Sequence, residues 1–317
     1  MFWNWVLLIV GMALLIKGAD FFVDGSSGIA KKFGIPSLII GLTLVSLGTS
    51  APEISISINA VLDGSSDMSV GNVVGSNICN IFLILGLASI FTPLLISKDV
   101  KKYDIPIMVG LFVLLIVFSY LITPNVINWY EGLIMLLLFI GYTVFLIFRA
   151  KNENQNEEPQ KNSNIVKCVI FVILGLAAIV FGGDLVVDHA RKIALDLGMS
   201  ETLVSLTIVA VGTSLPELVT SVVAAIKKEG DIAIGNVIGS CIFNIILILG
   251  LASVVSPFGP SGSLAVQSAV IMDVTVMLFG GVSLLLISCF SKKVDRWQGI
   301  IFLVIYVSYI IYIIVRN

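Results

Sequence analysis

Charged residues are scarce in this chain of 317 residues, because Asp, Glu, Lys and Arg together make up only 12% of it. An ordinary soluble domain has about twice that share. Hydrophobic residues make up 58%, and the mean hydropathy is +1.09. A soluble protein of this size still exposes about a quarter of its surface, so it cannot hide so much apolar surface. The composition excludes a soluble enzyme, a nucleic-acid binder and a disordered chain.

Imidazole and thiol ligands for metals are also few. His189 is the single histidine, and its neighbours Arg191 and Lys192 favour an interfacial position. The four cysteines lie in apolar runs without a CxxC spacing: Cys79, Cys168, Cys241 and Cys289. Such cysteines are expected to be small core residues, so we predict neither a disulfide framework nor zinc nor any other cofactor.

Long hydrophobic runs are abundant, and a span of about 20 residues crosses a bilayer. The apolar windows lie at about 3–23, 36–61, 68–91, 104–122, 126–148, 165–187, 200–226, 232–255, 264–288 and 297–315. The first window has no basic segment before it and no small-residue cleavage site after it, which favours a retained span over a cleaved signal. We therefore predict an all-α integral membrane protein with ten transmembrane helices.

The two halves of the chain repeat each other at a constant offset of 164 residues. GTSAPE at Gly48–Glu53 recurs as GTSLPE at Gly212–Glu217, and 15 of 20 positions are identical between residues 71–90 and 235–254. We infer two five-helix repeats, 1–148 and 165–317, joined by a polar linker at 149–164. Because five is odd, the second repeat enters the membrane from the opposite side, which is typical of secondary transporters.

The distribution of Lys and Arg predicts the orientation of these spans. Fourteen of them fall on the side that holds the linker and three on the other side, while Lys17 lies within the first window. The positive-inside rule then places the linker in the cytoplasm and both termini outside a plasma membrane. The lipid bilayer is the partner that follows, and neither a nucleic acid nor an obligatory protein partner is indicated.

Glu53 and Glu217 occupy matching places within two hydrophobic windows. A charge at the bilayer centre costs about 2.5–3.5 kcal/mol on the insertion scale, so such residues are functional candidates. A structural carboxylate held by hydroxyls is the alternative. It would rarely place a lone glutamate twice without a cationic neighbour in its motif.

Residues near both glutamates in the sequence offer further oxygen ligands. Pro52 and Pro216 each remove a helix N–H, so we expect carbonyls near Ser46–Gly48 and Ala210–Gly212 to lack intrahelical partners. Hydroxyl and amide groups at helical spacing add further candidates: Thr49, Ser50, Ser76, Asn80, Thr213, Ser214, Ser240 and Asn244. Interhelical hydrogen bonding is the alternative for Ser76, Asn80, Ser240 and Asn244.

An oxygen-only site suits Ca²⁺, Na⁺ or K⁺. Two carboxylates balance one Ca²⁺ or at least two Na⁺, and competition for one set of oxygens gives antiport. An empty site would carry two uncompensated buried charges, each costing several kcal/mol, through the occluded intermediate. That cost disfavours a leak and therefore a passive channel.

The GTS-x-PE and GN-(V)-x-GS-x-I-x-N segments closely resemble the α-repeats of the cation/calcium exchanger superfamily, prokaryotic sodium/calcium exchangers in particular. The resemblance covers nearly the whole chain. It implies that Glu53 and Glu217 bind Ca²⁺ and alternately Na⁺, and that the first and sixth spans are sliding helices. It also implies further ligands: the carbonyls of Ser46 and Ala210, the hydroxyl or carbonyl groups of Thr49, Ser50, Ser76, Thr213, Ser214 and Ser240, and the amide of Asn80.

Asn244 departs from the members of this superfamily that have Asp there, which include the potassium-dependent exchangers and some prokaryotic relatives, and resembles the potassium-independent animal exchangers instead. The resemblance therefore implies an exchanger that is independent of K⁺, and three Na⁺ per Ca²⁺ would make it electrogenic. Exchange of Ca²⁺ or another divalent ion for H⁺ is the alternative, because glutamates also carry protons. A membrane-embedded hydrolase is disfavoured, because no intramembrane histidine or paired nucleophile and base is found.

Four aspartates repeat at the same offset, namely Asp20 and Asp24 with Asp184 and Asp188. Solvation at helix ends explains them, and attraction of cations towards the site is the second interpretation. Asp273 lies inside the ninth window, and its counterpart is Val109. Two explanations for a charge at this position are an ion pair with Lys17 and access to water.

Overall fold

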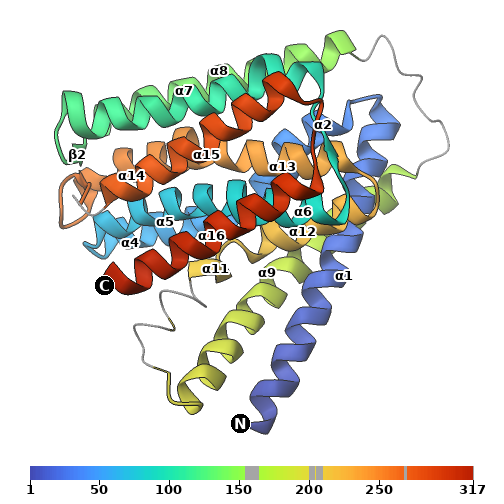
Figure 1. Ribbon diagram of the computed structural model, residues 1–317, viewed down its shortest axis with the longest axis horizontal. Helices are drawn as coiled ribbons and strands as arrows, with labels where there is room; N and C mark the ends of the chain where they lie inside the picture. The colour runs from blue at the N-terminus through green and yellow to red at the C-terminus, as the bar shows by residue number, and fades with distance from the viewer. Residues whose placement is uncertain (154–163, 200–203, 205–209, 268–269, 317) are drawn as a thin grey trace.

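The computed structural model describes residues 1–153, 164–199, 204, 210–267 and 270–316. This part of the chain is almost wholly helical (Figure 1), and eight of its helices are long and apolar enough to cross a membrane. A ninth candidate span is the bent pair Ser37–Thr49 and Ala51–Leu62. The predicted seventh window is represented by the shorter apolar helix Leu215–Ile226, because most of residues 200–209 lie outside the described part.

The first half of the chain contains five helical regions, several of which include π-helical turns (η). These are α1 (Phe2–Phe33); α2 (Ser37–Ile40), η1 (Gly41–Val45), α3 (Ser46–Thr49) and α4 (Ala51–Leu62); α5 (Ser66–Ile78), η2 (Cys79–Ile84) and α6 (Leu85–Phe91); η3 (Val100–Asp104), α7 (Ile105–Ile116) and η4 (Val117–Ile122); and α8 (Trp129–Glu153).

The second half follows the same order where it is described. Its helices are α9 (Ile165–Asp196); α11 (Ala210–Gly212) and α12 (Leu215–Ile226); α13 (Gly230–Phe243), η6 (Asn244–Leu249), α14 (Gly250–Val255) and the short 3₁₀-helix η7 (Ser256–Phe258); α15 (Val270–Phe290); and α16 (Arg296–Arg316).

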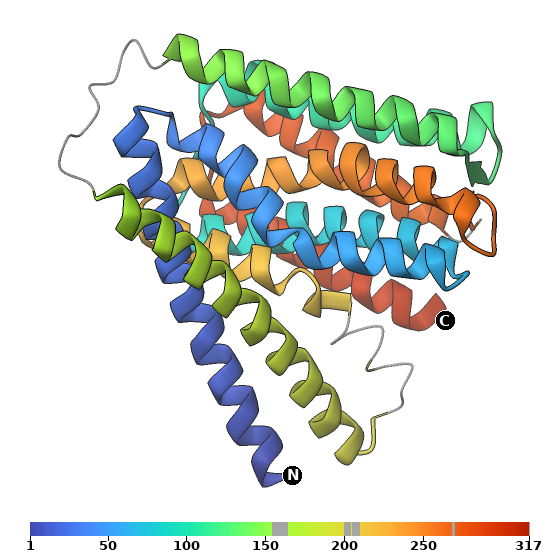
Figure 2. The ribbon, with the colours of Figure 1, turned by 180° about the vertical axis from the view of Figure 1, so that it is seen from behind.

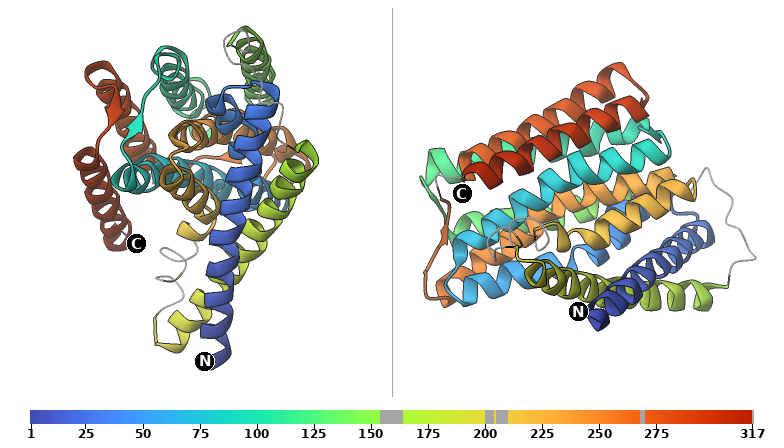
Figure 3. Two further views of the ribbon diagram at one scale, coloured as in Figure 1. Left: turned by 90° about the vertical axis from the view of Figure 1, so that its right-hand side faces the viewer. Right: turned by 60° about the horizontal axis from the view of Figure 1, so that its bottom comes forward.

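Two helical regions form the centre of the bundle. In Ser66–Phe91 and Gly230–Phe258, 78% and 83% of the most apolar window is buried, against 22–39% in the other six long spans. Figures 1 and 3 show α7, α8, α15 and α16 around these central regions. The outer helices carry exposed apolar side chains such as Leu137, Ile140 and Val304. An apolar outer surface of this kind is expected of a helix bundle that faces lipid.

Helices α1 and α9 pack against each other over much of their length, beside the rest of the bundle (Figure 2). Glycines make the close approach possible at Gly11 and Gly18 on α1 and at Gly175 and Gly182 on α9. A Cβ atom at any of these four positions would lie within 3.0 Å of the partner helix. Small residues at helix crossings are the usual means of close packing in membranes.

Two ribbons of two-residue strands, absent from the all-α prediction, join the halves of the chain. Strand β1 (Leu94–Leu95) pairs antiparallel with β4 (Lys293–Val294), and β2 (Val126–Ile127) pairs antiparallel with β3 (Leu264–Ala265). These ribbons define the two ends of the bundle used below, the β1–β4 end and the β2–β3 end.

Three helices extend beyond the predicted apolar windows. Helix α1 continues to Phe33, past the window that ends at residue 23, and α9 continues to Asp196, past the window that ends at residue 187. The polar residues in the last turns of α1 are accommodated inside the protein, since Ser26 and Ser27 are buried. Helix α8 continues to Glu153, so the predicted linker begins within a helix, and Arg149 at its start is buried.

Candidate cation-binding site

Helix breaks position both glutamates. The chain bends by 46° between Ser37–Thr49 and Ala51–Leu62, and Glu53 lies in the first turn of α4. Glu217 occupies the same place in α12, three residues after its N-cap residue Ser214. Pro52 and Pro216 lie within the first turn of these helices, where a missing N–H is tolerated. The positive end of each helix dipole therefore faces a carboxylate, which stabilises its charge.

Both glutamates lie in the protein interior, since each is only 1% exposed. The Ser50 hydroxyl donates to Glu217 Oε1 at 3.0 Å and lies 3.2 Å from the Ser240 hydroxyl. Ser50 belongs to the first half of the chain, whereas Glu217 and Ser240 belong to the second. Residues from both halves thus meet at one place.

Several buried oxygens on the predicted ligand residues have no hydrogen-bond partner among the described residues. They are one carboxylate oxygen of each glutamate, two amide oxygens and one hydroxyl: Glu53 Oε2, Glu217 Oε2, Asn80 Oδ1, Asn244 Oδ1 and Ser214 Oγ. A buried polar atom without a partner costs about 1–3 kcal/mol, and more when it is charged. Five such atoms on predicted ligand residues are the pattern expected of a site for a cation.

The other predicted ligands are placed as follows. Thr49, Ser46, Ser76 and Ser240 are buried, and Thr213 is half-buried. The Ser46 carbonyl was expected to lack an intrahelical partner, and this is wrong, because it accepts the Ser50 N–H at 3.0 Å. The helix bends after Thr49, so this bond survives. Ala210 begins α11, and its side chain lies outside the described part.

Two asparagines and two serines that hold the glutamate helices in place were not predicted from the sequence. Asn72 Nδ2 donates to the Glu53 carbonyl and to Ser57 Oγ, and Asn236 Nδ2 donates to the Glu217 carbonyl and to Ser221 Oγ. The GN dipeptide of the repeated motif was the available signal. Asn77 was also missed, and its Oδ1 accepts Asn244 Nδ2 at 2.9 Å. The amide oxygen of Asn244 has no donor among the described residues.

The glycines of the second motif differ between the halves. A Cβ atom at Gly239 would lie 2.7 Å from Ser46 Oγ, and one at Gly235 would lie 2.8 Å from the Leu38 carbonyl. Both glycines therefore permit the close helix approach that the sequence predicts. At Gly71 and Gly75 no described atom lies within 4 Å of a Cβ, so the expected close approach is not observed there.

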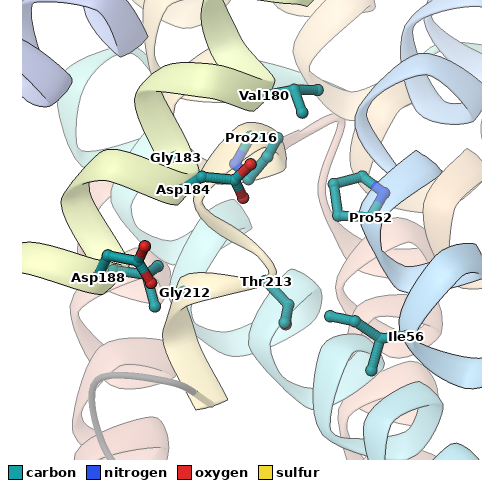
Figure 4. Close-up of a pocket in the computed structure, with 10 residues that line it drawn as sticks. Pro52, Ile56, Val180, Gly183, Asp184, Asp188, Gly212, Thr213 and Pro216 are labelled. Atoms are coloured by element: carbon teal, nitrogen blue, oxygen red, sulfur yellow. The ribbon is translucent and has the colours of Figure 1, made fainter. Parts of the chain in front are cut away.

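A cavity of about 280 Å³ adjoins the glutamate helices, between α4, α9, α11 and α12. Figure 4 shows Asp184 and Asp188 of α9 on one side of it, Pro52 and Ile56 of α4 on the other, and Thr213 between them. Both aspartates are exposed, and α9 continues beyond them to Asp196. The two aspartates were expected to lie at the end of their helix. They lie before its end and line a cavity.

Other charged residues in the spans form ion pairs away from the glutamates. Lys227 Nζ lies 2.5 Å from Asp20 Oδ1 and 2.6 Å from Asp24 Oδ1, which joins α1 to the end of α12. Asp273 pairs with Arg316 at 3.3 Å, not with Lys17 as considered from the sequence. The two partners are 43 positions apart on α15 and α16, so only packing brings them together.

Within the described residues no three His, Cys, Asp or Glu side chains cluster in a way that could hold a metal. His189 is largely buried, and its Nδ1 lies 3.1 Å from Asn4 Oδ1. Cys79 and Cys241 are buried as predicted, while Cys168 is half-buried and Cys289 is exposed. Chemically, the arrangement offers two carboxylates with neutral amide and hydroxyl oxygens, a set suited to hard cations.

Comparison with known proteins now decides the family. The model of the family described as "Sodium/calcium exchanger protein" matches residues 3–148 and 167–315. The chain belongs to this exchanger family. The sodium/calcium exchanger MaX1 of Methanosarcina acetivorans is 34% identical to it over 348 residues, covering 97% of both chains. An uncharacterized membrane protein of Methanocaldococcus jannaschii, MJ0091, is 37% identical over 301 residues, 94% of both chains.

The solved structures agree with this assignment. A structure of the sodium-calcium exchanger NCX_Mj superposes with a TM-score of 0.84 at 34% identity, covering 97% of both chains. The resemblance found in the sequence is therefore confirmed, as is a multi-pass, all-α membrane fold. This exchanger belongs to a family of transporters rather than of catalysts, and its homologues support Na⁺/Ca²⁺ antiport.

Proposed function

We propose that this protein exchanges Na⁺ for Ca²⁺ by alternating access at one site built around Glu53 and Glu217. The observation that carries the proposal is the set of five buried, unpartnered oxygens on Glu53, Glu217, Asn80, Asn244 and Ser214. A bound cation would coordinate these atoms and offset the cost of burying them. Thr49, Ser50, Ser76, Thr213 and Ser240 with the carbonyls of Ser46 and Ala210 complete the proposed ligand set.

Charge balance explains why the two ions would be exchanged. Two carboxylates neutralise one Ca²⁺, and several Na⁺ can replace it on the same oxygens. The unloaded site would carry two buried negative charges, which makes its reorientation slow. Binding of either ion neutralises these charges, so the site changes its access only when an ion is bound.

The surroundings of the site fit this cycle. The cavity beside Thr213 and Pro216 leads from Asp184 and Asp188 towards the glutamate helices and would serve as the access route from the β2–β3 end. We propose ten spans in two inverted repeats, 1–148 and 165–317, with the 149–164 linker in the cytoplasm and both termini outside the plasma membrane. The β2–β3 end is then the outer end.

Exchange should proceed without K⁺, because Asn244 is neutral where potassium-dependent relatives carry a carboxylate. Purified protein in liposomes loaded with Na⁺ should take up ⁴⁵Ca²⁺ at full rate in K⁺-free medium. The matched measurement imposes a pH gradient alone at equal Na⁺, which should drive no uptake. Loss of uptake without K⁺ would refute potassium independence, and uptake driven by the pH gradient alone would indicate H⁺ coupling instead.

Exchange should also carry net charge. Three Na⁺ for one Ca²⁺ moves one charge per cycle, worth about 2.3 kcal/mol per 100 mV, which shifts the transport equilibrium nearly 50-fold. The oxygens of both GTS motifs provide ligands for several small ions. Setting the membrane potential with a K⁺ gradient and its ionophore should change the Ca²⁺ uptake rate. Flux that is insensitive to voltage would instead support two Na⁺ per Ca²⁺.

A further inference from the structure

The asparagine of each GN dipeptide makes the same contacts in both halves. Asn72 Nδ2 lies 3.0 Å from Ser57 Oγ and 3.4 Å from the Glu53 carbonyl oxygen. Asn236 Nδ2 lies 2.9 Å from Ser221 Oγ and 3.4 Å from the Glu217 carbonyl oxygen. Each amide thus fastens the first turn of a glutamate helix, α4 or α12, to the neighbouring helix, α5 or α13. The contacts fix the backbone from which each carboxylate extends.

The amide oxygens of these asparagines differ, however. Asn236 Oδ1 accepts a hydrogen bond from Thr49 Oγ1 at 3.1 Å, and both side chains are fully buried. This bond joins the two halves, because Thr49 ends α3 in the first and Asn236 lies on α13 in the second. It stands beside the close helix approach at Gly239.

The equivalent bond in the other half would join Thr213 to Asn72. It is not formed: these two described residues share no hydrogen bond, both are only half-buried, and Thr213 lines the cavity instead (Figure 4). The hydrogen bond that is formed is therefore fully buried, whereas the one that is not formed would involve Thr213, which lines the cavity.

We propose that Asn72 and Asn236 are positioning residues for cation transport, and that the contacts Thr49–Asn236 and Thr213–Asn72 alternate during the cycle. The first is made while the cavity beside Thr213 is open. When access reverses, Thr49 releases Asn236, and Thr213 moves onto Asn72 and closes that cavity. This inference rests on the proposed alternating access, and it names the hydrogen bonds that distinguish the two states.

The alternation is tested by cysteine accessibility, which does not depend on transport. Ile56→Cys reports on the open cavity, and Thr220→Cys at the repeat counterpart of Ile56 reports on access from the other side. Both are made with Cys168 and Cys289 replaced by alanine, and a charged, membrane-impermeant thiol reagent is applied from each face. The labelling rate at Ile56→Cys divided by that at Thr220→Cys measures the balance between the two states.

Removing each threonine hydroxyl should shift this ratio in opposite directions. Thr49→Val should lower it about fivefold, since one hydrogen bond that favours the open cavity is lost, and Thr213→Val should raise it by a similar factor. General damage to the fold would not produce opposite signs. Shifts in the same direction, or an unchanged ratio in both variants, would overturn the alternation.

The positioning role is tested by the concentration dependence of transport. Asn72→Ala and Asn236→Ala should each raise the Ca²⁺ concentration for half-maximal uptake about tenfold, because the glutamate helix loses its anchor. Asn59→Ala is the matched control, since Asn59 bonds Ser55 on the same helix α4 but both are exposed. An unchanged half-saturation in the asparagine variants would refute the role. If the wild-type protein fails to exchange Na⁺ for Ca²⁺, the proposed function fails, while the accessibility result stands on its own.

Discussion

Replacing either glutamate by glutamine should abolish Ca²⁺ transport. Glu53→Gln and Glu217→Gln each keep the size of the side chain but leave the site one negative charge short of Ca²⁺. An uncompensated buried charge costs several kcal/mol, so we expect uptake to fall at least about 100-fold in each variant. The measurement is Na⁺-driven ⁴⁵Ca²⁺ uptake into liposomes at a known protein content.

Glu131→Gln provides the matched control for this loss. Glu131 is also a buried carboxylate, but it accepts hydrogen bonds from Thr123 Oγ1 at 2.8 Å and from the Asn128 N–H at 2.7 Å, at the start of α8. This residue takes no part in the proposed site, so its variant should transport Ca²⁺. A Glu53→Gln or Glu217→Gln protein that transports at near the wild-type rate would disprove the shared two-carboxylate site.

The second large effect concerns stability. Arg149 Nη1 lies 2.9 Å from Asp104 Oδ2, Asp104 is fully buried, and the Tyr142 hydroxyl donates to Asp104 Oδ1 at 3.2 Å. Arg149→Leu would leave a buried carboxylate without its cation. Breaking a buried pair in this way costs about 3–5 kcal/mol, so we expect a clear drop in the thermal unfolding temperature of the purified protein in detergent.

The double variant Arg149→Leu/Asp104→Leu separates charge from packing. With both groups removed, no buried charge of this pair is left unpaired, and Asp99, which also lies 3.7 Å from Arg149, is partly exposed to solvent, so most of the lost stability should return. A double variant as unstable as Arg149→Leu would show that contacts of the arginine side chain, not its charge, hold α8 to the η3–α7 region.

The prolines predicted irregular backbone beside both glutamates but not where the helices break. In the structure a break precedes both α4 and α12, whereas the expected loss of a partner for the Ser46 carbonyl is wrong. The ends of α1 and α9 were missed because charges at Asp20, Asp24 and Asp188 look like helix ends when the chain is read alone. In the structure Lys227, about 200 positions away, pairs with the first two, and α1 continues past them to Phe33.

The residues of the candidate site were predictable only in part. Repetition at a fixed offset singled out Glu53, Glu217, Asn80 and Asn244, and each of them carries an unpartnered buried oxygen. The anchoring roles of Asn72 and Asn236 depend on how α4 lies against α5 and α12 against α13. Spacing along the chain contains no information on those crossings, so the contacts follow only from the folded helices.

The ion pairs of Lys227 make the two ends of the molecule unequal, because the residue 164 positions earlier is Asp63. At the β1–β4 end Lys227 holds Asp20 and Asp24, whereas the repeat counterparts Asp184 and Asp188 line the cavity. Reversal of access would break two attractions at one end and gain none at the other. The groups are partly exposed, so each pair contributes only about 0.2–1 kcal/mol. With the β2–β3 end outside, as proposed, the exchanger would rest open to the outside, and Ca²⁺ would bind more tightly from there than from the cytoplasm.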